Sequence, residues 1–122
     1  MPENFIGTDI VSVLRIEKII QQYPERFKKH TFTPDEESYC DSKANPPVHY
    51  AGRFAAKEAI KKAIYSSGII NSINFNSIEI ISDDSGVPEV RLSSIGLDNI
   101  LVKVSISHIE EYAIAFALVS QS

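Results

Sequence analysis

The sequence predicts an α+β domain in which an antiparallel β-sheet packs against a long central helix, the fold expected of a single domain over residues 1–122. Two observations lead to this prediction. The N-terminal segment and the C-terminal part alternate apolar and polar residues with the period of strands. Residues 51–68 (AGRFAAKEAIKKAIYSSG) instead carry apolar residues at helical spacing. A length of 122 residues, 43% of them hydrophobic, is enough for one compact core.

The N-terminal region is predicted to be a strand followed by a helix. Residues 4–13 (NFIGTDIVSV) alternate and are rich in β-branched types, with Gly7 at a bend or a point of close approach. Apolar residues recur at helical spacing over residues 13–23. Pro24 is expected to break or end that helix.

Two helices are predicted in the middle of the chain. Residues 33–36 (TPDE) have the composition of a capping box with a first-turn proline, so a short helix should begin there and end near Asp41. Residues 42–50 (SKANPPVHY) are predicted to be a loop that leads into the long helix. Gly68 has the character of the residue just past the end of that helix.

The C-terminal part is predicted to form two β-hairpins. Residues 77–82 (SIEIIS) and 87–92 (VPEVRL) alternate on either side of the turn sequence DDSG. Residues 101–109 (LVKVSISHI) and 112–120 (YAIAFALVS) form the second pair. The order of a strand, helices and then hairpins gives the α+β domain.

One face of the long helix is unusual. Its core-facing stripe is apolar and runs through residues 56–64. The opposite face carries Phe54, Glu58, Lys61, Lys62 and Tyr65. Charges are expected on a solvated face, but an aromatic residue near each end requires something to cover it.

Charge is distributed unevenly along the chain. The net charge is -4, yet residues 15–30 and residues 51–65 each carry an excess of three positive charges. An acidic body therefore carries two basic segments, which are either solvated helix faces or surfaces for an anionic partner. A nucleic-acid binder would usually be basic overall, so no nucleic-acid partner is expected.

The sequence indicates a cytoplasmic protein. Its single cysteine, Cys40, cannot form an internal disulfide and has no neighbouring cysteine or histidine at metal-binding spacing. The N-terminus lacks the features of a signal peptide, and no apolar stretch is long enough to span a membrane.

Three polar residues stand in unexpected places, each with an ordinary alternative. Asp9 lies in the middle of a strand, where it faces either solvent or a cation. Glu58 could form an ion pair with Lys62 at i+4. His108 follows Val102, Val104 and Ile106 in phase, so it is either a hydrogen-bonded core histidine or a group at the edge of a site.

Together these residues match one chemistry. Mg²⁺ takes oxygen ligands, usually one or two carboxylates completed by substrate phosphates and water. Nearby lysines and arginines then hold the remaining phosphate oxygens. Such a site transfers phosphorylated groups by positioning and charge neutralisation. The sequence contains neither G-x-x-x-x-G-K-[ST] nor G-x-G-x-x-G, so a standard nucleotide-binding loop is excluded.

Five motifs in series give the chain its resemblance to a family. They are GTDIVSV, the set Arg26, Phe27, Thr33 and Glu36, AGRFAAKEAIKKA, DDSGVP and VSISH. In this order and spacing they resemble the holo-acyl-carrier-protein synthases, the small bacterial-type 4′-phosphopantetheinyl transferases. The resemblance covers nearly the whole chain.

The resemblance implies a reaction and its metal. Members transfer 4′-phosphopantetheine from coenzyme A to a serine of apo acyl carrier protein, release adenosine 3′,5′-bisphosphate and serve fatty acid biosynthesis. Asp9 and Glu58 would be the Mg²⁺ ligands. Glu58, directly or through a metal-bound water, would take the proton from the attacking serine.

The resemblance also implies binding roles. Arg53, Lys62 and His108 would contact phosphates, with His108 counted among the catalytic residues, while Gly86 and Pro88 would let backbone approach the nucleotide. Phe54 is expected beside the coenzyme. Members are homotrimers with the site between two subunits, so a neighbour and the coenzyme would cover the face that carries Phe54 and Glu58.

Two further implications concern the partner and the coenzyme phosphates. Arg15 and Arg26 would receive the acidic helix of the carrier protein. Residues 42–50 contain fewer basic residues than is usual in the family, and Lys43 or His49 could substitute in contacts to the 3′-phosphate. Two other functions stay open at this point: a small-molecule binding domain without turnover, and a module whose basic helix docks an acidic partner.

Overall fold

A three-stranded antiparallel sheet forms one side of the molecule. The computed structural model describes residues 3–83, 85–94 and 96–121. Strand β1 (Glu3–Ser12) pairs with β5 (Tyr112–Gln121), which pairs in turn with β4 (Ile100–His108), so β1 and β4 lie at opposite edges. Strands β2 (Ile78–Ser82) and β3 (Pro88–Leu92) form a separate two-stranded sheet. Both predicted hairpins are confirmed; Asp84 of the first turn lies outside the described residues.

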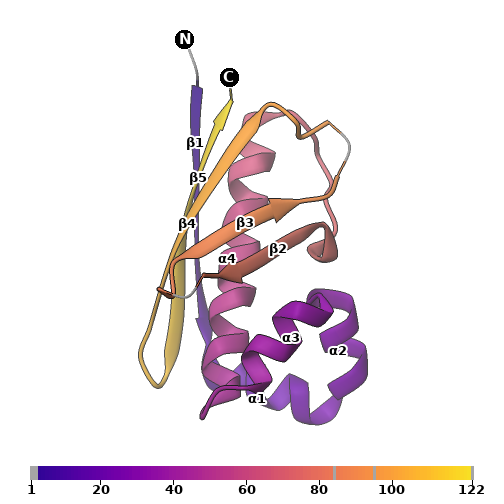
Figure 1. The fold of residues 1–122 in the computed structure, drawn as a ribbon, viewed down its shortest axis with the longest axis vertical. Coiled ribbons are helices and arrows are strands. Elements are labelled where there is room, and N and C mark those ends of the chain that lie inside the picture. Colours follow the sequence, from indigo (N-terminus) through magenta and orange to yellow (C-terminus); the bar gives the residue numbers. More distant parts are fainter. Residues whose placement is uncertain (1–2, 84, 95, 122) are drawn as a thin grey trace.

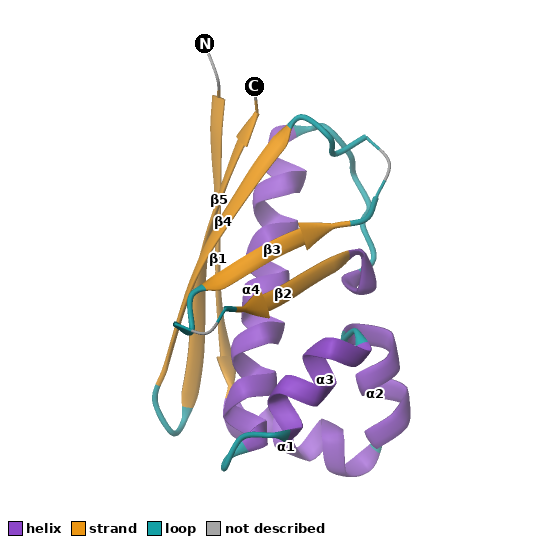
Figure 2. Cartoon of the chain, in the orientation of Figure 1, coloured by secondary structure: helices purple, strands orange, loops and turns teal. Residues whose placement is uncertain are grey.

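The long helix α4 (Pro46–Ser67) packs along the inner face of the three-stranded sheet (Figure 1). Helices α1 (Val13–Gln22), α2 (Pro24–Thr31) and α3 (Pro34–Asp41) gather at one end of α4, and the short 3₁₀ helix η1 (Phe75–Ser77) precedes β2 (Figure 2). The fold is the predicted α+β arrangement. Among the described residues, no helix has the length and apolar composition required to cross a membrane.

Local signals placed several helix ends correctly. Thr33 and Glu36 form the predicted capping box, in which each side chain accepts a hydrogen bond from the other residue's backbone N–H. Gly68 caps α4 in the left-handed conformation, with φ of 75°. Helix α3 ends at Asp41 as expected. Such signals can be recognised in the sequence because they involve residues only a few positions apart.

Two boundaries differ from the prediction. Residues 46–50 belong to α4 and not to a loop, because the two prolines occupy the first helical turn, where an N–H has no intrahelical partner to lose. Pro24 ends one helix but also begins the next, since it is the first residue of α2. Helix α4 is therefore one turn longer than expected, and its start carries His49.

Close contact between β1 and α4 sets the position of Asp9. A Cβ atom added to Gly7 would lie 2.0 Å from the backbone oxygen of Ala59, so glycine permits the strand to cross the helix here. Asp9 follows Gly7 by two residues and points to the same face, toward α4. Glu58 precedes Ala59. The crossing therefore brings the two carboxylate-bearing segments together.

A buried ion pair ties α4 to the smaller elements. Lys57 and Glu36 are fully buried, with 2.5 Å between Lys57 Nζ and Glu36 Oε1. Lys57 also donates to the backbone oxygens of Thr31 and Phe75, and Glu36 accepts from the Ile80 N–H. Burial lowers the pKa of Lys57, an effect opposed by the Glu36 carboxylate. This network fixes α4 against α2, α3, η1 and β2.

The outer face of the three-stranded sheet is apolar and exposed. Its large side chains include Ile6 and Ile10 from β1 and Ile114 and Phe116 from β5, which are between 44% and 67% exposed. Ile10 is paired with Ile114, and Thr8 with Phe116. A contiguous apolar face of this kind is unusual for a surface that remains in water.

Candidate functional site

Most of the predicted site residues divide between two pockets on either side of α4, while Lys62 lies beside one of them and Arg26 on a separate surface. One pocket lies at the β1 edge of the sheet and the other at the β4 edge. We call them the carboxylate pocket, which contains Asp9 and Glu58, and the cation pocket, which contains Arg53 and His108. The first pocket carries two carboxylates, whereas the second carries an arginine and histidines.

The carboxylate pocket is formed where β1 meets α1 and α4. It is lined by Asp9, Ile10, Val11, Ser12, Arg15, Ile16, Ile19, Phe54 and Glu58. Asp9 and Glu58, predicted as a pair from distant parts of the sequence, therefore face one pocket. Arg15, in the first turn of α1, lines the same pocket. Ser12 caps α1, because its side chain accepts a hydrogen bond from the Arg15 N–H at 3.2 Å.

Lys62 supplies a positive charge beside this pocket. Its Nζ lies 3.1 Å from Asp9 Oδ1 and also donates to the Thr8 backbone oxygen at 3.0 Å. The alternative in which Lys62 pairs with Glu58 is wrong, since the structure's described residues give Lys62 an ion pair with Asp9 instead. Asp9 accordingly faces a cation. The ordinary alternative of a solvated Asp9 is also wrong, because its side chain is only 17% exposed.

The donor set of the carboxylate pocket suits a hard divalent cation. Two carboxylates from different elements line the same pocket, and one of them, Asp9, already forms an ion pair with Lys62. Over residues 3–83, 85–94 and 96–121, no cluster of three or more His, Cys, Asp or Glu could hold a metal alone. A cation here would need substrate phosphates and water to complete its shell, which is the way proteins commonly bind Mg²⁺.

Phe54 is covered in part by its own chain. Its ring centroid lies 5.7 Å from that of Phe75 and 6.0 Å from that of Phe27. Lys61 places its Nζ 3.9 Å from the Phe75 ring centroid. The expectation that a neighbour and the coenzyme cover this face is thus incomplete. The sequence could not show it, because the covering rings come from α2 and η1.

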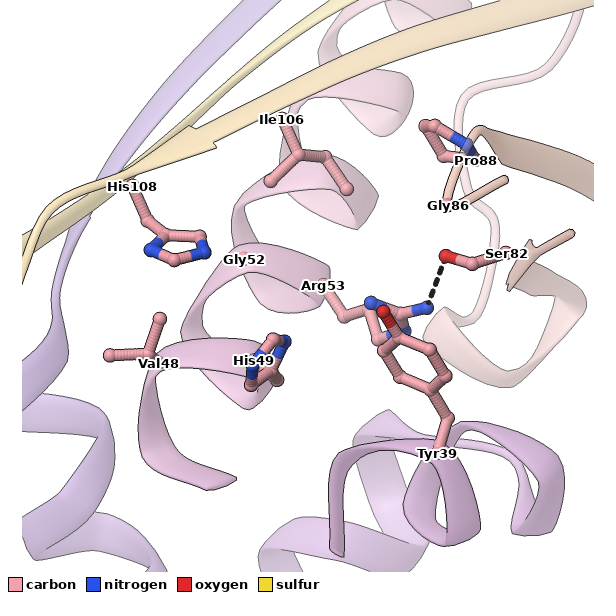
Figure 3. Close-up of a pocket in the computed structure, with 10 residues that line it drawn as sticks. All are labelled: Tyr39, Val48, His49, Gly52, Arg53, Ser82, Gly86, Pro88, Ile106 and His108. Atoms are coloured by element: carbon pink, nitrogen blue, oxygen red, sulfur yellow. Dashed lines mark hydrogen bonds between the residues drawn. The ribbon is translucent and has the colours of Figure 1, made fainter. Parts of the chain in front are cut away.

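The cation pocket lies between the start of α4, the end of β4 and the β2–β3 turn (Figure 3). It is lined by Tyr39, Val48, His49, Gly52, Arg53, Ser82, Gly86, Pro88, Ile106 and His108. Four residues predicted from motifs far apart in the sequence thus meet: Arg53, Gly86, Pro88 and His108. None of the ten lining residues carries a carboxylate.

Arg53 is the most strongly held group in the cation pocket. It is 4% exposed, and its guanidinium lies 3.8 Å from the Tyr39 ring centroid. One terminal nitrogen donates to Ser82 Oγ at 3.0 Å (Figure 3). Its Nε is buried without a hydrogen-bond partner among the described residues. A guanidinium that lines a pocket without carboxylates is suited to bind an anion.

Two histidines face one another in the same pocket. His108 is exposed at the end of β4, so the alternative of a hydrogen-bonded core histidine is wrong. Its ring centroid lies 5.7 Å from that of His49. Burial is the main cause that lowers the pKa of His49 below 6.5, and the positive charges of His108, Arg53 and Lys43 act in the same direction.

A third surface connects the two basic positions of the N-terminal helices. Arg26 lies beside an apolar hollow that is also lined by Ile19, Tyr23, Phe27 and His30. Arg15 belongs to the adjoining carboxylate pocket. Helices α1 and α2 therefore present apolar side chains between two arginines, next to Glu58.

Comparison with known proteins assigns the family. A sequence model described as ACPS, 4′-phosphopantetheinyl transferase superfamily, matches residues 5–117. The chain belongs to this superfamily. It is 42% identical to a holo-[acyl-carrier-protein] synthase of Ruminiclostridium cellulolyticum, over 97% of this chain and 92% of that protein. It is 40% identical to the protein of the same name from Protochlamydia amoebophila, over 93% and 94% of the two chains.

Solved structures agree with this assignment. A holo-(acyl-carrier-protein) synthase from Bacillus anthracis, in complex with CoA (3′,5′-ADP), has a TM-score of 0.81 with 34% identity, covering 97% of this chain and 96% of that one. The Helicobacter pylori synthase in complex with coenzyme A has a TM-score of 0.77 and 34% identity, covering 93% and 98%. The predicted family and fold are confirmed.

This phosphopantetheinyl transferase has pocket residues that sequence reasoning missed. Tyr39 and Ser82, which hold Arg53, were not singled out, and His49 was considered only as a substitute in phosphate contacts. Tyr39 and Ser82 carry no local signal, because they reach Arg53 from α3 and the end of β2. The prediction of Lys62 as a phosphate contact stays a prediction, since Lys62 lies with Asp9 at the other pocket.

Proposed function

We propose that this transferase moves 4′-phosphopantetheine from coenzyme A to a serine of apo acyl carrier protein, releasing adenosine 3′,5′-bisphosphate. The observation that carries the proposal is the convergence of Asp9 and Glu58 on one pocket in a chain of this superfamily. A binding domain or a docking module has no requirement for two carboxylates that face the same pocket.

Asp9 and Glu58 are the proposed ligands of Mg²⁺, which would neutralise the coenzyme's diphosphate when bound. Glu58 is also the proposed base: it accepts the proton of the serine hydroxyl as that oxygen attacks the pantetheine-side phosphorus. The bond from this phosphorus to the adenylate-side phosphate then breaks, and adenosine 3′,5′-bisphosphate departs. Lys62, already on Asp9, is placed to contact a phosphate oxygen if it leaves that carboxylate.

The cation pocket is the proposed nucleotide site. Arg53, which lines this pocket, would donate from its guanidinium to phosphate oxygens. His108 would hydrogen-bond to a phosphate, and Gly86, with φ of 85° in the turn, leaves room for the nucleotide beside Pro88. Phe54, in the carboxylate pocket, would contact the pantetheine side of the coenzyme.

We propose that the active enzyme is a homotrimer with sites between subunits. The two pockets lie at opposite sheet edges of one chain, so a second copy could place its cation pocket beside the first chain's carboxylate pocket. The exposed apolar face, with Ile6, Ile10, Ile114 and Phe116, is the surface proposed to be buried. A repeated contact of this kind forms a ring when the rotation between successive copies closes, as the proposed trimer requires.

The acidic carrier protein is proposed to dock on α1 and α2. Arg15 and Arg26 would pair with its carboxylates, and the hollow of Ile19, Tyr23 and Phe27 would receive an apolar side chain. This surface adjoins Glu58, so a docked serine would arrive beside its proposed base.

We further propose that residues 1–122 act as one transferase domain in the cytoplasm, supplying carrier protein to fatty acid biosynthesis. Pairing of β1 with β5 joins the two ends of the chain in one sheet, which supports a single domain. Burial raises the pKa of the Cys40 thiol to about 12, so this residue takes no part in the chemistry.

Mass spectrometry provides the test. Apo carrier protein incubated with the enzyme, coenzyme A and Mg²⁺ should gain the mass of one phosphopantetheine on its serine. Chelation of the metal should prevent the gain, and readdition of Mg²⁺ should restore it. An unchanged carrier mass with the untreated enzyme would exclude the proposed transfer and favour a binding or docking role.

A further inference from the structure

His49 occupies a position in the cation pocket to which the proposed reaction gives no role. It is half-buried near the start of α4. Its ring lies between Tyr39 of α3, at 6.0 Å between centroids, and His108 of β4, at 5.7 Å. In Figure 3 the two imidazoles face one another at the side of the pocket away from Pro88. The pair therefore forms one wall of the pocket.

The charged side chains that act on His49 are all basic. Arg53 reaches it from α4, His108 from β4 and Lys43 from the segment between α3 and α4, while Tyr39 contributes an uncharged ring. The first turn of α4 contains no acidic residue, and no side chain caps its N-terminus. The helix dipole thus adds to the positive potential.

The charges of this pocket are complementary to an anion. Arg53 is 4% exposed, and its buried Nε has no hydrogen-bond partner among the described residues. The Arg53 side chain lines the pocket, and none of the lining residues carries a carboxylate to pair with it. Phosphate oxygens accept from guanidinium and from imidazolium, and a phosphate close to both histidines would favour their charged forms.

We propose that His49 and His108 form a proton-coupled phosphate clamp, in which a phosphate group of coenzyme A draws a proton from solvent onto His49 as it binds. The inference rests on the proposed function, because it assumes that coenzyme A occupies the cation pocket. No covalent bond changes: water supplies the proton, His49 carries it while the phosphate is bound, and release returns it. Coenzyme affinity then depends on pH through His49.

The direction of the effect follows from linkage. In the free protein, burial and neighbouring cations lower the pKa of His49, so the ring is neutral near pH 7. A bound phosphate raises the pKa of the same ring. Between the two values, binding takes up a proton, and affinity increases as the pH falls. Below the free-state pKa the gain levels off, because His49 is already charged before binding.

Isothermal titration calorimetry tests the clamp. Coenzyme A is titrated into the enzyme in buffers of different ionisation enthalpy, between about pH 6 and 8. The unmodified enzyme should take up a fraction of a proton at each site. Its affinity should fall roughly tenfold across this range, the size expected for one charge-assisted hydrogen bond. His49→Gln should show a weaker pH dependence than the unmodified enzyme and should lack the His49 share of the proton uptake.

Two variants separate the clamp from damage to the fold. His49→Lys carries a permanent charge, so it should retain tight binding at about pH 8 without proton uptake. His30→Gln is the matched control for coenzyme binding, because His30 lies near Phe75 and outside the cation pocket, and it should bind coenzyme A with the pH dependence of the unmodified enzyme. Thermal unfolding of each variant shows whether it is folded.

The same titration with 3′-dephospho-coenzyme A identifies the phosphate. Loss of the His49-dependent uptake assigns the clamp to the 3′-phosphate, and its persistence assigns it to the diphosphate; both support the clamp. Equal proton uptake and equal pH profiles for His49→Gln and the unmodified enzyme would overturn it while leaving transfer intact. An unmodified enzyme that does not bind coenzyme A would overturn both this inference and the proposed function.

Discussion

The cation pocket and the carboxylate pocket differ in how firmly their charged groups are held. Arg53 is 4% exposed, stacked on Tyr39 and hydrogen-bonded to Ser82. Asp9 is held instead by Lys62, whose side chain is 54% exposed. An ion pair whose lysine is this exposed contributes about 1 kcal/mol or less, so Lys62 can leave Asp9 at little cost. One pocket is preorganised for an anion, and the other can exchange its counterion for a metal and phosphates.

The same comparison supports the proposal that two copies of the chain share each site. The two pockets stand at opposite edges of a three-stranded sheet, with α4 between them. A coenzyme that contacts a carboxylate pocket and a cation pocket at once is most simply held between two copies of the chain. Variants that alter one pocket at a time separate the roles of the two pockets, with expected effects that range from large to small.

Removing a carboxylate charge should cause the largest loss. Glu58→Gln and Asp9→Asn keep the size of each side chain but remove a proposed metal ligand, and in Glu58→Gln also the base. Transfer, measured by carrier mass, should fall roughly 10²- to 10⁴-fold. Binding of adenosine 3′,5′-bisphosphate, measured by calorimetry, should stay within about threefold, because the cation pocket is unchanged. Transfer above a tenth of normal in either variant would argue against these roles.

Arg53→Met should produce the reverse pattern. Loss of the buried guanidinium removes charge-assisted hydrogen bonds to phosphate, so affinity for adenosine 3′,5′-bisphosphate should fall roughly 10- to 100-fold. Arg91→Met, which removes an exposed arginine of β3, is the matched control. If the two variants bind this nucleotide equally well, the cation pocket is not its site.

Mixing inactive chains should restore part of the activity. A trimer assembled from equal amounts of Glu58→Gln and Arg53→Met chains contains some sites in which both pockets are intact. Random assembly should return roughly a quarter of the normal activity. Phe116→Asp in both chains places charge on the exposed apolar face and should prevent this recovery, together with the trimer itself by light scattering. A mixture no more active than its parents would place the whole site within one chain.

Arg15→Glu should have the smallest effect, confined to the protein partner. Reversing this charge on α1 weakens attraction to an acidic carrier, so the KM for carrier protein should rise about five- to tenfold. The KM for coenzyme A should not change. Arg91→Glu makes the same charge change on β3 and should affect neither constant. A KM for coenzyme A that rises in parallel would remove the docking role of Arg15.

The sequence by itself determined the elements whose signals are local. The capping box of Thr33 and Glu36, the glycine cap at Gly68 and the two hairpins each depend on residues close together in the chain. Binary alternation likewise placed Asp9 in a strand. Motif resemblance selected the family, and from it the residues that the structure brings into two pockets.

Only the tertiary structure decided what those residues touch. Arg53 meets Tyr39 and Ser82, Phe54 meets Phe27 and Phe75, and Lys62 pairs with Asp9 although Glu58 is nearer in sequence. These contacts join elements that are far apart in the chain, and no periodicity or capping rule encodes them. They arise when β1 crosses α4 at Gly7 and the smaller elements pack around Lys57, because side-chain partners are fixed by packing in three dimensions.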